Sequence, residues 1–192
     1  MKASLHFISG MVSFGTCCVI GGKGWTGSYL TKHLINIKRN KTLNQQYNIN
    51  SIHVIDLIND KFNNIIRRDD DSLLYVTHHT CDITNFKHIN RLLCVINPTV
   101  IYHLASIIDL RKYPSELLER VNVQGTWNIL YTLINSLDDD IDRYLIYTSS
   151  IDVASTKVYI MHARLMNTQV EILFLLTIIK EQRSLRSSYV SP

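Results

Sequence analysis

The feature that most constrains the fold of this 192-residue chain is a glycine-rich turn, GGKGWTG, at residues 21–27. The turn follows the apolar residues 17–20 and precedes apolar positions that recur at helical spacing over residues 25–38. An apolar run that ends in glycine is typical of a buried strand, and the later spacing is that of an amphipathic helix. A strand, a tight turn and a helix in this order indicate an α/β fold.

Strands and helices alternate along most of the chain. The hydrophobic pattern predicts further strands at 51–57, 73–77, 99–105 and 143–148, and helices at about 85–96 and from Ser115 onward, with the Ser115 hydroxyl as N-cap. The polar, asparagine-rich residues 40–50 are predicted to form a loop. The alternation predicts a Rossmann-like, doubly wound parallel sheet with helices on both faces.

The length of the chain suits one hydrophobic core. We expect a dinucleotide-binding domain at residues 1–155 and a divergent segment at 156–192. Apolar residues at helical spacing in that segment predict a helix from about 165 to 183. The apolar run 172–179 is much shorter than the roughly 20 residues that cross a bilayer, so we expect no transmembrane segment.

Charge and ligand patterns exclude several classes of function. The formal charge of +4 is spread along the chain, with no basic stripe for a nucleic acid. The four cysteines lack metal-ligand spacing, and the adjacent His78 and His79 lack a carboxylate or thiolate at ligand spacing. We therefore predict no metal site and interpret these two histidines as surface loop residues.

The glycine turn has the pattern GxxGxxG in the context that binds a dinucleotide. Gly21 and Gly24 would let the backbone approach the pyrophosphate, and Gly27 would let the helix pack closely on the strand. The N–H groups of Trp25 and Thr26 would face the phosphates at the positive end of the helix dipole. The alternative is a glycine turn without a ligand.

Asp56 follows the second predicted strand and is the candidate ligand for the adenine ribose. A carboxylate there accepts both ribose hydroxyls and repels a 2′-phosphate, so it favours NAD over NADP. It lies 29 positions after Gly27, further than the roughly 20 that are usual, and the polar residues 40–50 account for the surplus. The alternative is an aspartate that caps the end of a strand.

Three blocks of sequence occur in the order found in extended short-chain dehydrogenases: VIYHLASIID at 100–109, VNVQGT at 121–126 and YLIYTSSIDVA at 144–154. Together they resemble the 3β-hydroxysteroid dehydrogenase/isomerase family, over about residues 17–155. The resemblance implies that Asp82 and Ile83 hold the adenine and that Ala105 and Ser106 line the nicotinamide side. It also implies that Asn122 braces the fourth and fifth strands.

The resemblance implies oxidation of the 3β-hydroxyl of a steroid or sterol with NAD. A serine, a tyrosine and a lysine carry this chemistry in the family, and Ser150, or else Ser149, matches the serine. The Tyr-x-x-x-Lys motif is missing: four positions after Tyr159 stands Ala163, and no other tyrosine precedes a lysine at that spacing. The family's substrate-binding C-terminal region is not matched either, so we expect a truncated chain.

Two classes of function stay open. The first is an NAD-dependent oxidoreductase of the steroid type, with a sugar epimerase or reductase relative as the runner-up. The second is a non-catalytic dinucleotide-binding module or fragment. The resemblance implies a location on the cytoplasmic side, with association with the endoplasmic reticulum membrane as an option, and the sequence indicates no oligomeric state.

Overall fold

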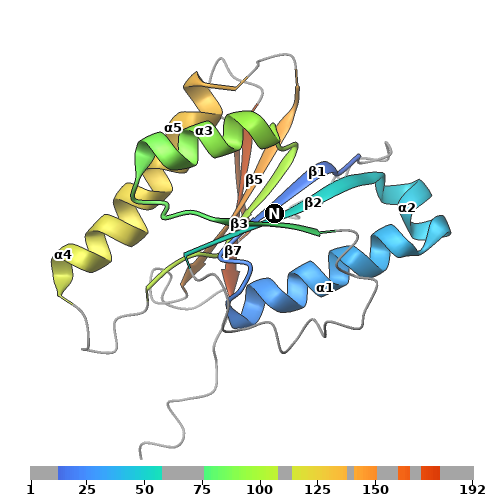
Figure 1. Cartoon of the computed structure of the whole chain (residues 1–192), viewed down its shortest axis with the longest axis horizontal. Coiled ribbons are helices and arrows are strands. Elements are labelled where there is room, and N and C mark those ends of the chain that lie inside the picture. The colour runs from blue at the N-terminus through green and yellow to red at the C-terminus, as the bar shows by residue number, and fades with distance from the viewer. Residues whose placement is uncertain are drawn as a thin grey trace, which may run out of the picture.

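The computed structural model describes residues 13–57, 76–107, 114–137, 141–150, 160–164 and 170–177. Within them the chain forms one sheet of seven strands in the order β3-β2-β1-β4-β5-β7-β6, and all of its strands except β6 run parallel (Figure 1). The strands are β1 (Gly15–Ile20), β2 (Ile49–Asp56), β3 (Val76–Thr80), β4 (Val100–His103), β5 (Arg143–Ser150), β6 (Ile160–Arg164) and β7 (Val170–Thr177).

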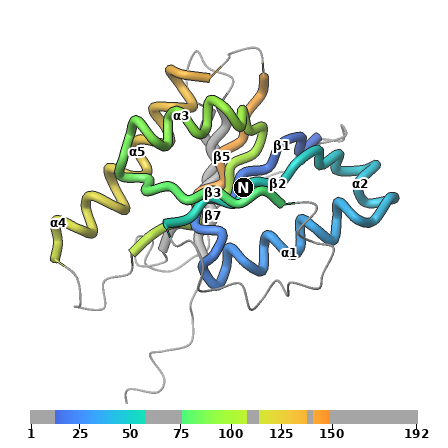
Figure 2. The backbone as a smooth tube through the Cα atoms, in the orientation of Figure 1, coloured from blue at the N-terminus to red at the C-terminus, as the bar shows by residue number. Residues whose placement is uncertain are grey.

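Helices cover both faces of this sheet (Figure 2). On one face lie α1 (Trp25–Arg39) and α2 (Lys41–Tyr47). The other face carries α3 (Phe86–Ile96) and a long helix built from α4 (Ser115–Leu118), the π-helical η2 (Glu119–Gly125) and α5 (Thr126–Asn135). The fold is therefore α/β and Rossmann-like, as the sequence predicts. Its parallel strands have the order β3-β2-β1-β4-β5-β7.

Strand β1 shows why the sheet needs helices on both sides. Its residues alternate between two hydrophobic clusters: Cys17 and Val19 pack toward α1, whereas Cys18 and Ile20 pack toward α3 and α5. All four are fully buried. A strand that is buried on both faces reads in the sequence as an unbroken apolar run, which is the pattern at residues 17–20.

Arg143 fixes the start of β5 against the end of α3. Its side chain is only 2% exposed. Its guanidinium donates to the carbonyl of Pro98 at 2.7 Å and to the side-chain oxygen of Asn97 at 2.8 Å. Asn97 has a positive φ and ends α3 in the left-handed conformation, so the arginine satisfies polar groups at a buried helix end.

Two local predictions differ from the structure. The predicted loop at 40–50 contains α2, which has no buried residue and is held by its caps: Asn40 accepts from the N–H of Leu43, and Asn48 adopts a left-handed conformation. Ser115 is not its own N-cap, because the cap position is Pro114 and no side chain caps this end within the described residues. Strand β3 is described from Val76, so the predicted residues 73–75 lie outside the described part.

The helix predicted at about 165–183 is wrong over its described residues. Residues 170–177 form β7, which pairs in parallel with β5, and β6 pairs antiparallel with β7. The pattern misleads because a short, continuous apolar run suits a strand buried on both faces as well as a helix. The proposed boundary at 155/156 and residues 178–183 lie outside the described residues.

Candidate cofactor site

The turn after β1 and the loop after β4 meet at the carboxyl edge of the sheet. Gly21 donates its N–H to the carbonyl of Ile55 at 2.8 Å and has a φ of +81°. A Cβ atom on Gly21 would lie 2.6 Å from the backbone nitrogen of Ala105. Glycine is therefore required here, and it brings two of the predicted site residues, Gly21 and Ala105, into contact.

The other two motif glycines differ in their surroundings. A Cβ on Gly27 would lie 2.2 Å from the carbonyl oxygen of Gly21 and 2.6 Å from the Cα of Gly22. A Cβ on Gly24 would meet only the Gly21 carbonyl oxygen, at 3.3 Å, among the described atoms. Gly27 thus serves close packing inside the turn, whereas Gly24 is exposed and its Cβ position is crowded by this one backbone oxygen.

The start of α1 is open to a negatively charged ligand. Gly24 is the N-cap, no described side chain caps this end, and the first turn holds no acidic residue. Trp25 and Thr26 are exposed. The first backbone N–H groups of a helix lack partners within the helix and carry the positive end of its dipole, so the predicted phosphate position is electrostatically suitable.

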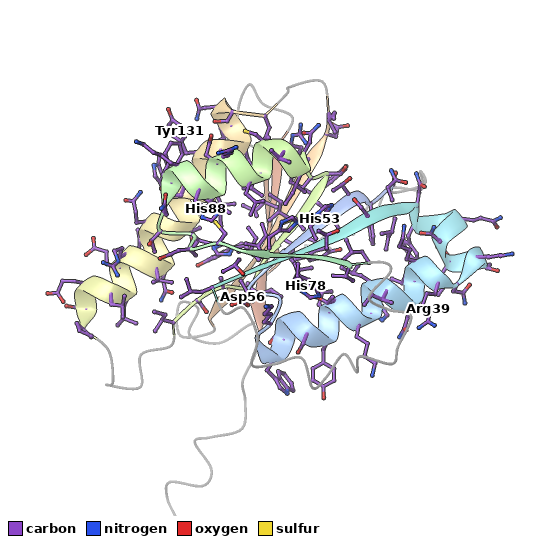
Figure 3. All side chains as sticks on the ribbon, viewed as in Figure 1. Arg39, His53, Asp56, His78, His88 and Tyr131 are labelled. Carbon is purple, nitrogen blue, oxygen red and sulfur yellow. The ribbon has the colours of Figure 1, made fainter. Side chains whose placement is uncertain are left out.

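Asp56 lies at the edge of the sheet that faces the start of α1, whereas Arg39 lies at the far end of that helix (Figure 3). The carboxylate of Asp56 accepts from the backbone N–H of Lys23 at 2.9 Å and from the backbone N–H of its neighbour Leu57 at 2.8 Å. Asp56 therefore does cap the end of its strand and also holds the glycine turn. An ionised carboxylate can accept about four hydrogen bonds, so these two do not by themselves prevent it from accepting ribose hydroxyls.

The loop after β3 places Asp82 and Ile83 in different environments. Asp82 is half-buried and accepts from the N–H of Thr84 at 2.9 Å. The side chain of Ile83 is only 6% exposed, and it fills the space in front of Gly125, where a Cβ would lie 2.6 Å away. Because this side chain belongs to the core, only the backbone of Ile83 remains to face an adenine ring.

Sequence reasoning missed Asn128, which fixes this same loop. Its side chain is 3% exposed and donates to the carbonyls of Ile83 at 2.8 Å and Thr84 at 3.3 Å. Gln124 donates to its side-chain oxygen at 2.9 Å. A buried asparagine on the apolar side of a predicted helix was the available signal, because such a group must find hydrogen-bond partners.

Asn122 holds the loop after β4. Its side chain accepts from the N–H of Ile107 and donates to the carbonyl of the same residue, both at 2.8 Å. Asn122 therefore braces η2 against the loop after β4. The resemblance implied a brace between the fourth and fifth strands, and these two hydrogen bonds do not form one. Ala105 and Ser106 lie just before Ile107, and Ser106 is exposed.

Ser149 and Ser150 end β5. The register pairs His103 with Tyr147, so the two serines lie alongside the loop that follows β4. Their backbones pair with Leu176 and Thr177 of β7. Tyr159 lies outside the described residues, and the catalytic role of the serines stays a prediction.

The sequence predicts His78 and His79 in a surface loop, and the structure differs. His78 and His79 belong to β3 and not to a loop. The Nε2 of His79 lies 3.0 Å from the Nδ1 of His53, and burial lowers the pKa of both rings. His103 is 1% exposed, and burial lowers its pKa to about 4. The described residues contain no group of three metal-ligating side chains.

No helix among the described residues has the length and apolar character needed to cross a membrane.

The strand order and the glycine turn define a Rossmann domain of the kind found in extended short-chain dehydrogenases and epimerases. The chain belongs to the 3-beta hydroxysteroid dehydrogenase/isomerase family, whose sequence profile matches residues 18–170. A comparison with curated proteins gives no significant match.

Solved structures share the fold. A monomeric L-threonine 3-dehydrogenase from a metagenome has a TM-score of 0.50 and 24% identity, over 70% of this chain and 36% of its own. WbmG of Bordetella bronchiseptica, in complex with NAD and UDP, has a TM-score of 0.51 and 19% identity, over 70% and 37%. UDP-glucose 4-epimerase of Thermus thermophilus, in complex with NAD, has a TM-score of 0.52 and 16% identity, over 79% and 41%. The chain thus spans about two fifths of the length of these proteins.

Proposed function

We propose that this chain binds NAD at the carboxyl edge of its sheet. The observation that carries the proposal is the uncapped start of α1 behind the exposed Gly24, next to a carboxylate at the end of β2. The pyrophosphate would lie against the N–H groups of Trp25 and Thr26, and Asp56 would accept the adenine ribose hydroxyls. Two of the structural relatives are described in complex with NAD, which supports this assignment.

The chemistry that we propose is oxidation of the 3β-hydroxyl of a steroid or sterol. Bound NAD supplies the hydride acceptor for such a step. Ser150, with Ser149 as the alternative, would orient the substrate oxygen beside the loop at Ala105 and Ser106. The substrate class, a cytoplasmic-side location and association with the endoplasmic reticulum rest on the family alone.

A second candidate is a dinucleotide-binding module without catalysis. It is favoured by the absence of a Tyr-x-x-x-Lys motif from the sequence. Without that pair, no identified group of this chain takes the proton of the substrate hydroxyl, so binding and turnover need separate tests. An NAD-dependent epimerase or reductase is the remaining option within the enzyme class, in line with the epimerase and dehydrogenase folds above.

The test is calorimetric titration of the purified chain with NAD and with NADP, beside the variant Asp56→Asn. Hydrogen bonds to a charged group contribute about 1.5–3 kcal/mol, so the variant should bind NAD at least about tenfold more weakly and lose its preference over NADP. Asp142→Asn is the matched control, because Asp142 is exposed and precedes β5. Equal affinities for NAD in wild type and Asp56→Asn would contradict the ribose assignment.

An assay for NADH with a 3β-hydroxysteroid on the same sample separates the two candidates. NAD binding with turnover supports the dehydrogenase, and NAD binding without turnover supports the module. A wild-type chain that binds neither NAD nor NADP would refute both.

A further inference from the structure

The loop that follows β4 is held at both of its ends. At its start, Leu104 donates its N–H to the carbonyl of Ile20 at 2.8 Å and so continues the contact with β1. At its other described end, both backbone groups of Ile107 are bound by the side chain of Asn122. Between these anchors lie Ala105 and Ser106, the residues that our proposed function assigns to the nicotinamide side of the cofactor.

A hydrogen-bonded chain connects the second anchor to a buried histidine. The Nε2 of His103, in β4, lies 2.9 Å from the hydroxyl oxygen of Thr126. That hydroxyl also lies 2.7 Å from the carbonyl oxygen of Asn122. Asn122 then binds Ile107, so the chain runs from the end of β4 through the long helix and back to the loop that leaves β4.

The hydrogen bonds of the Thr126 hydroxyl fix the tautomer of His103. A threonine hydroxyl has one hydrogen, and it donates that hydrogen to the carbonyl oxygen of Asn122, which can only accept. It must then accept from His103, so the hydrogen of the ring is on Nε2. The Nδ1 atom is left as a bare acceptor, and it is buried without a partner among the described residues. The ring stays neutral at neutral pH because burial lowers its pKa to about 4.

We propose that His103 and Thr126 are positioning residues that set the loop at 104–107, and through it the nicotinamide half of the cofactor site. This inference rests on the proposed binding of NAD. Leaving the Nε2–H of His103 buried without an acceptor is unfavourable. Loss of the Thr126 hydroxyl therefore forces the ring or the end of β4 to move. Asn122 sits in the π-helical turn, a distortion that recurs at functional sites.

The adenine half of the site has its own supports. The loop at Asp82 and Ile83 is held by Asn128, and the glycine turn is held by Asp56. Neither support passes through His103 or Thr126. The contact between Gly21 and Ala105 still joins the glycine turn to the loop after β4. Loss of the Thr126 hydroxyl should therefore weaken a ligand that reaches the nicotinamide side more than one that stops at the pyrophosphate.

The experiment compares NAD with ADP by calorimetry on the full chain, in wild type, Thr126→Val and Thr126→Ser. Valine keeps the shape of threonine without the hydroxyl, and serine keeps the hydroxyl. Thr126→Val should bind NAD about tenfold more weakly and ADP within about twofold of wild type, and Thr126→Ser should restore NAD binding. Unchanged NAD binding in Thr126→Val, an equal loss of ADP, or a serine variant as weak as the valine variant would overturn the inference.

A second measurement decides the matter if Thr126→Val does not fold. Nitrogen-15 NMR of the wild-type imidazoles reports which ring nitrogen of His103 carries the hydrogen. We expect the hydrogen on Nε2 and none on Nδ1. A hydrogen on Nδ1 would overturn the proposed hydrogen bond from His103 to Thr126. If the wild-type protein binds neither ADP nor NAD, the proposed function is contradicted instead. The tautomer of His103 then still tests the hydrogen bonds between His103, Thr126 and Asn122.

Discussion

Gly24 and Gly27 belong to one motif, yet alanine should affect them in opposite ways. At Gly24 the backbone has a φ of −69° and a ψ of 171°, which any residue can adopt. The new Cβ would meet only the carbonyl oxygen of Gly21, at 3.3 Å, among the described atoms. A glycine-to-alanine change at a compatible position stabilises by about 0.4–1 kcal/mol. The free energy of unfolding of Gly24→Ala should therefore stay within about 1 kcal/mol of wild type.

At Gly27 the same change places a methyl group 2.2 Å from a backbone oxygen and 2.6 Å from the Cα of Gly22. Neither neighbour is a flexible side chain, so the turn itself must shift. Overpacking of this kind costs typically about 1–3 kcal/mol, and the rigid neighbours put Gly27→Ala at the upper end of that range. For a domain of this size, such a loss lowers the melting temperature by about 5–10 °C.

The assay is thermal unfolding of both variants together with NAD titration. Gly24→Ala should melt near the wild-type temperature and bind NAD at least about tenfold more weakly, because its methyl group fills the space proposed for the pyrophosphate. Gly27→Ala should melt early. The reasoning fails if Gly24→Ala binds NAD like wild type, or if Gly27→Ala melts at the wild-type temperature.

Three further predictions concern buried polar groups. Arg143→Met should lower the free energy of unfolding in urea by about 1–3 kcal/mol, because the carbonyl of Pro98 loses its donor; an unchanged urea midpoint would contradict this. Burial lowers the pKa of His103 to about 4, so the unfolded chain takes up a proton near pH 6.5 that the folded chain does not bind. Stability should therefore fall as the pH drops from about 6.5 to about 4, by at most about 3 kcal/mol from this residue, and His103→Gln should flatten the profile. Asn128→Ala should weaken ADP and NAD binding alike, since it releases the loop after β3; a loss confined to NAD would refute that role.

The parts of the fold that follow from local patterns could be predicted from the sequence. The strand at residues 17–20, the turn at 21–27 and the helix that starts at Trp25 agree with the structure because apolar spacing and glycine act over a few residues. The short α2 was missed because it buries nothing and so leaves no apolar period, only asparagine caps. β7 lies where the sequence predicts a helix, because its run of apolar residues fits both kinds of element.

The hydrogen bonds of the site could not be predicted, because they join residues far apart in the chain. Asn128 reaches Ile83 across 45 positions, and His53 reaches His79 across 26. Neither of these separations in sequence leaves a periodic pattern that a single sequence could show. The glycine motif indicates the candidate site, and the register of the strands decides which polar side chains meet there.

The long helix that follows the loop after β4 holds both halves of the proposed site. Asn122 binds Ile107 on one side, and Asn128 binds the loop at Ile83 on the other, where Gly125 gives Ile83 room. These contacts join residues that all precede β5 in the sequence. The proposed dinucleotide site therefore does not rest on the tyrosine and lysine motif that this sequence lacks. Binding of NAD without turnover would be consistent with this arrangement. The calorimetric assay measures binding and the NADH assay measures turnover, so the two functions can be separated.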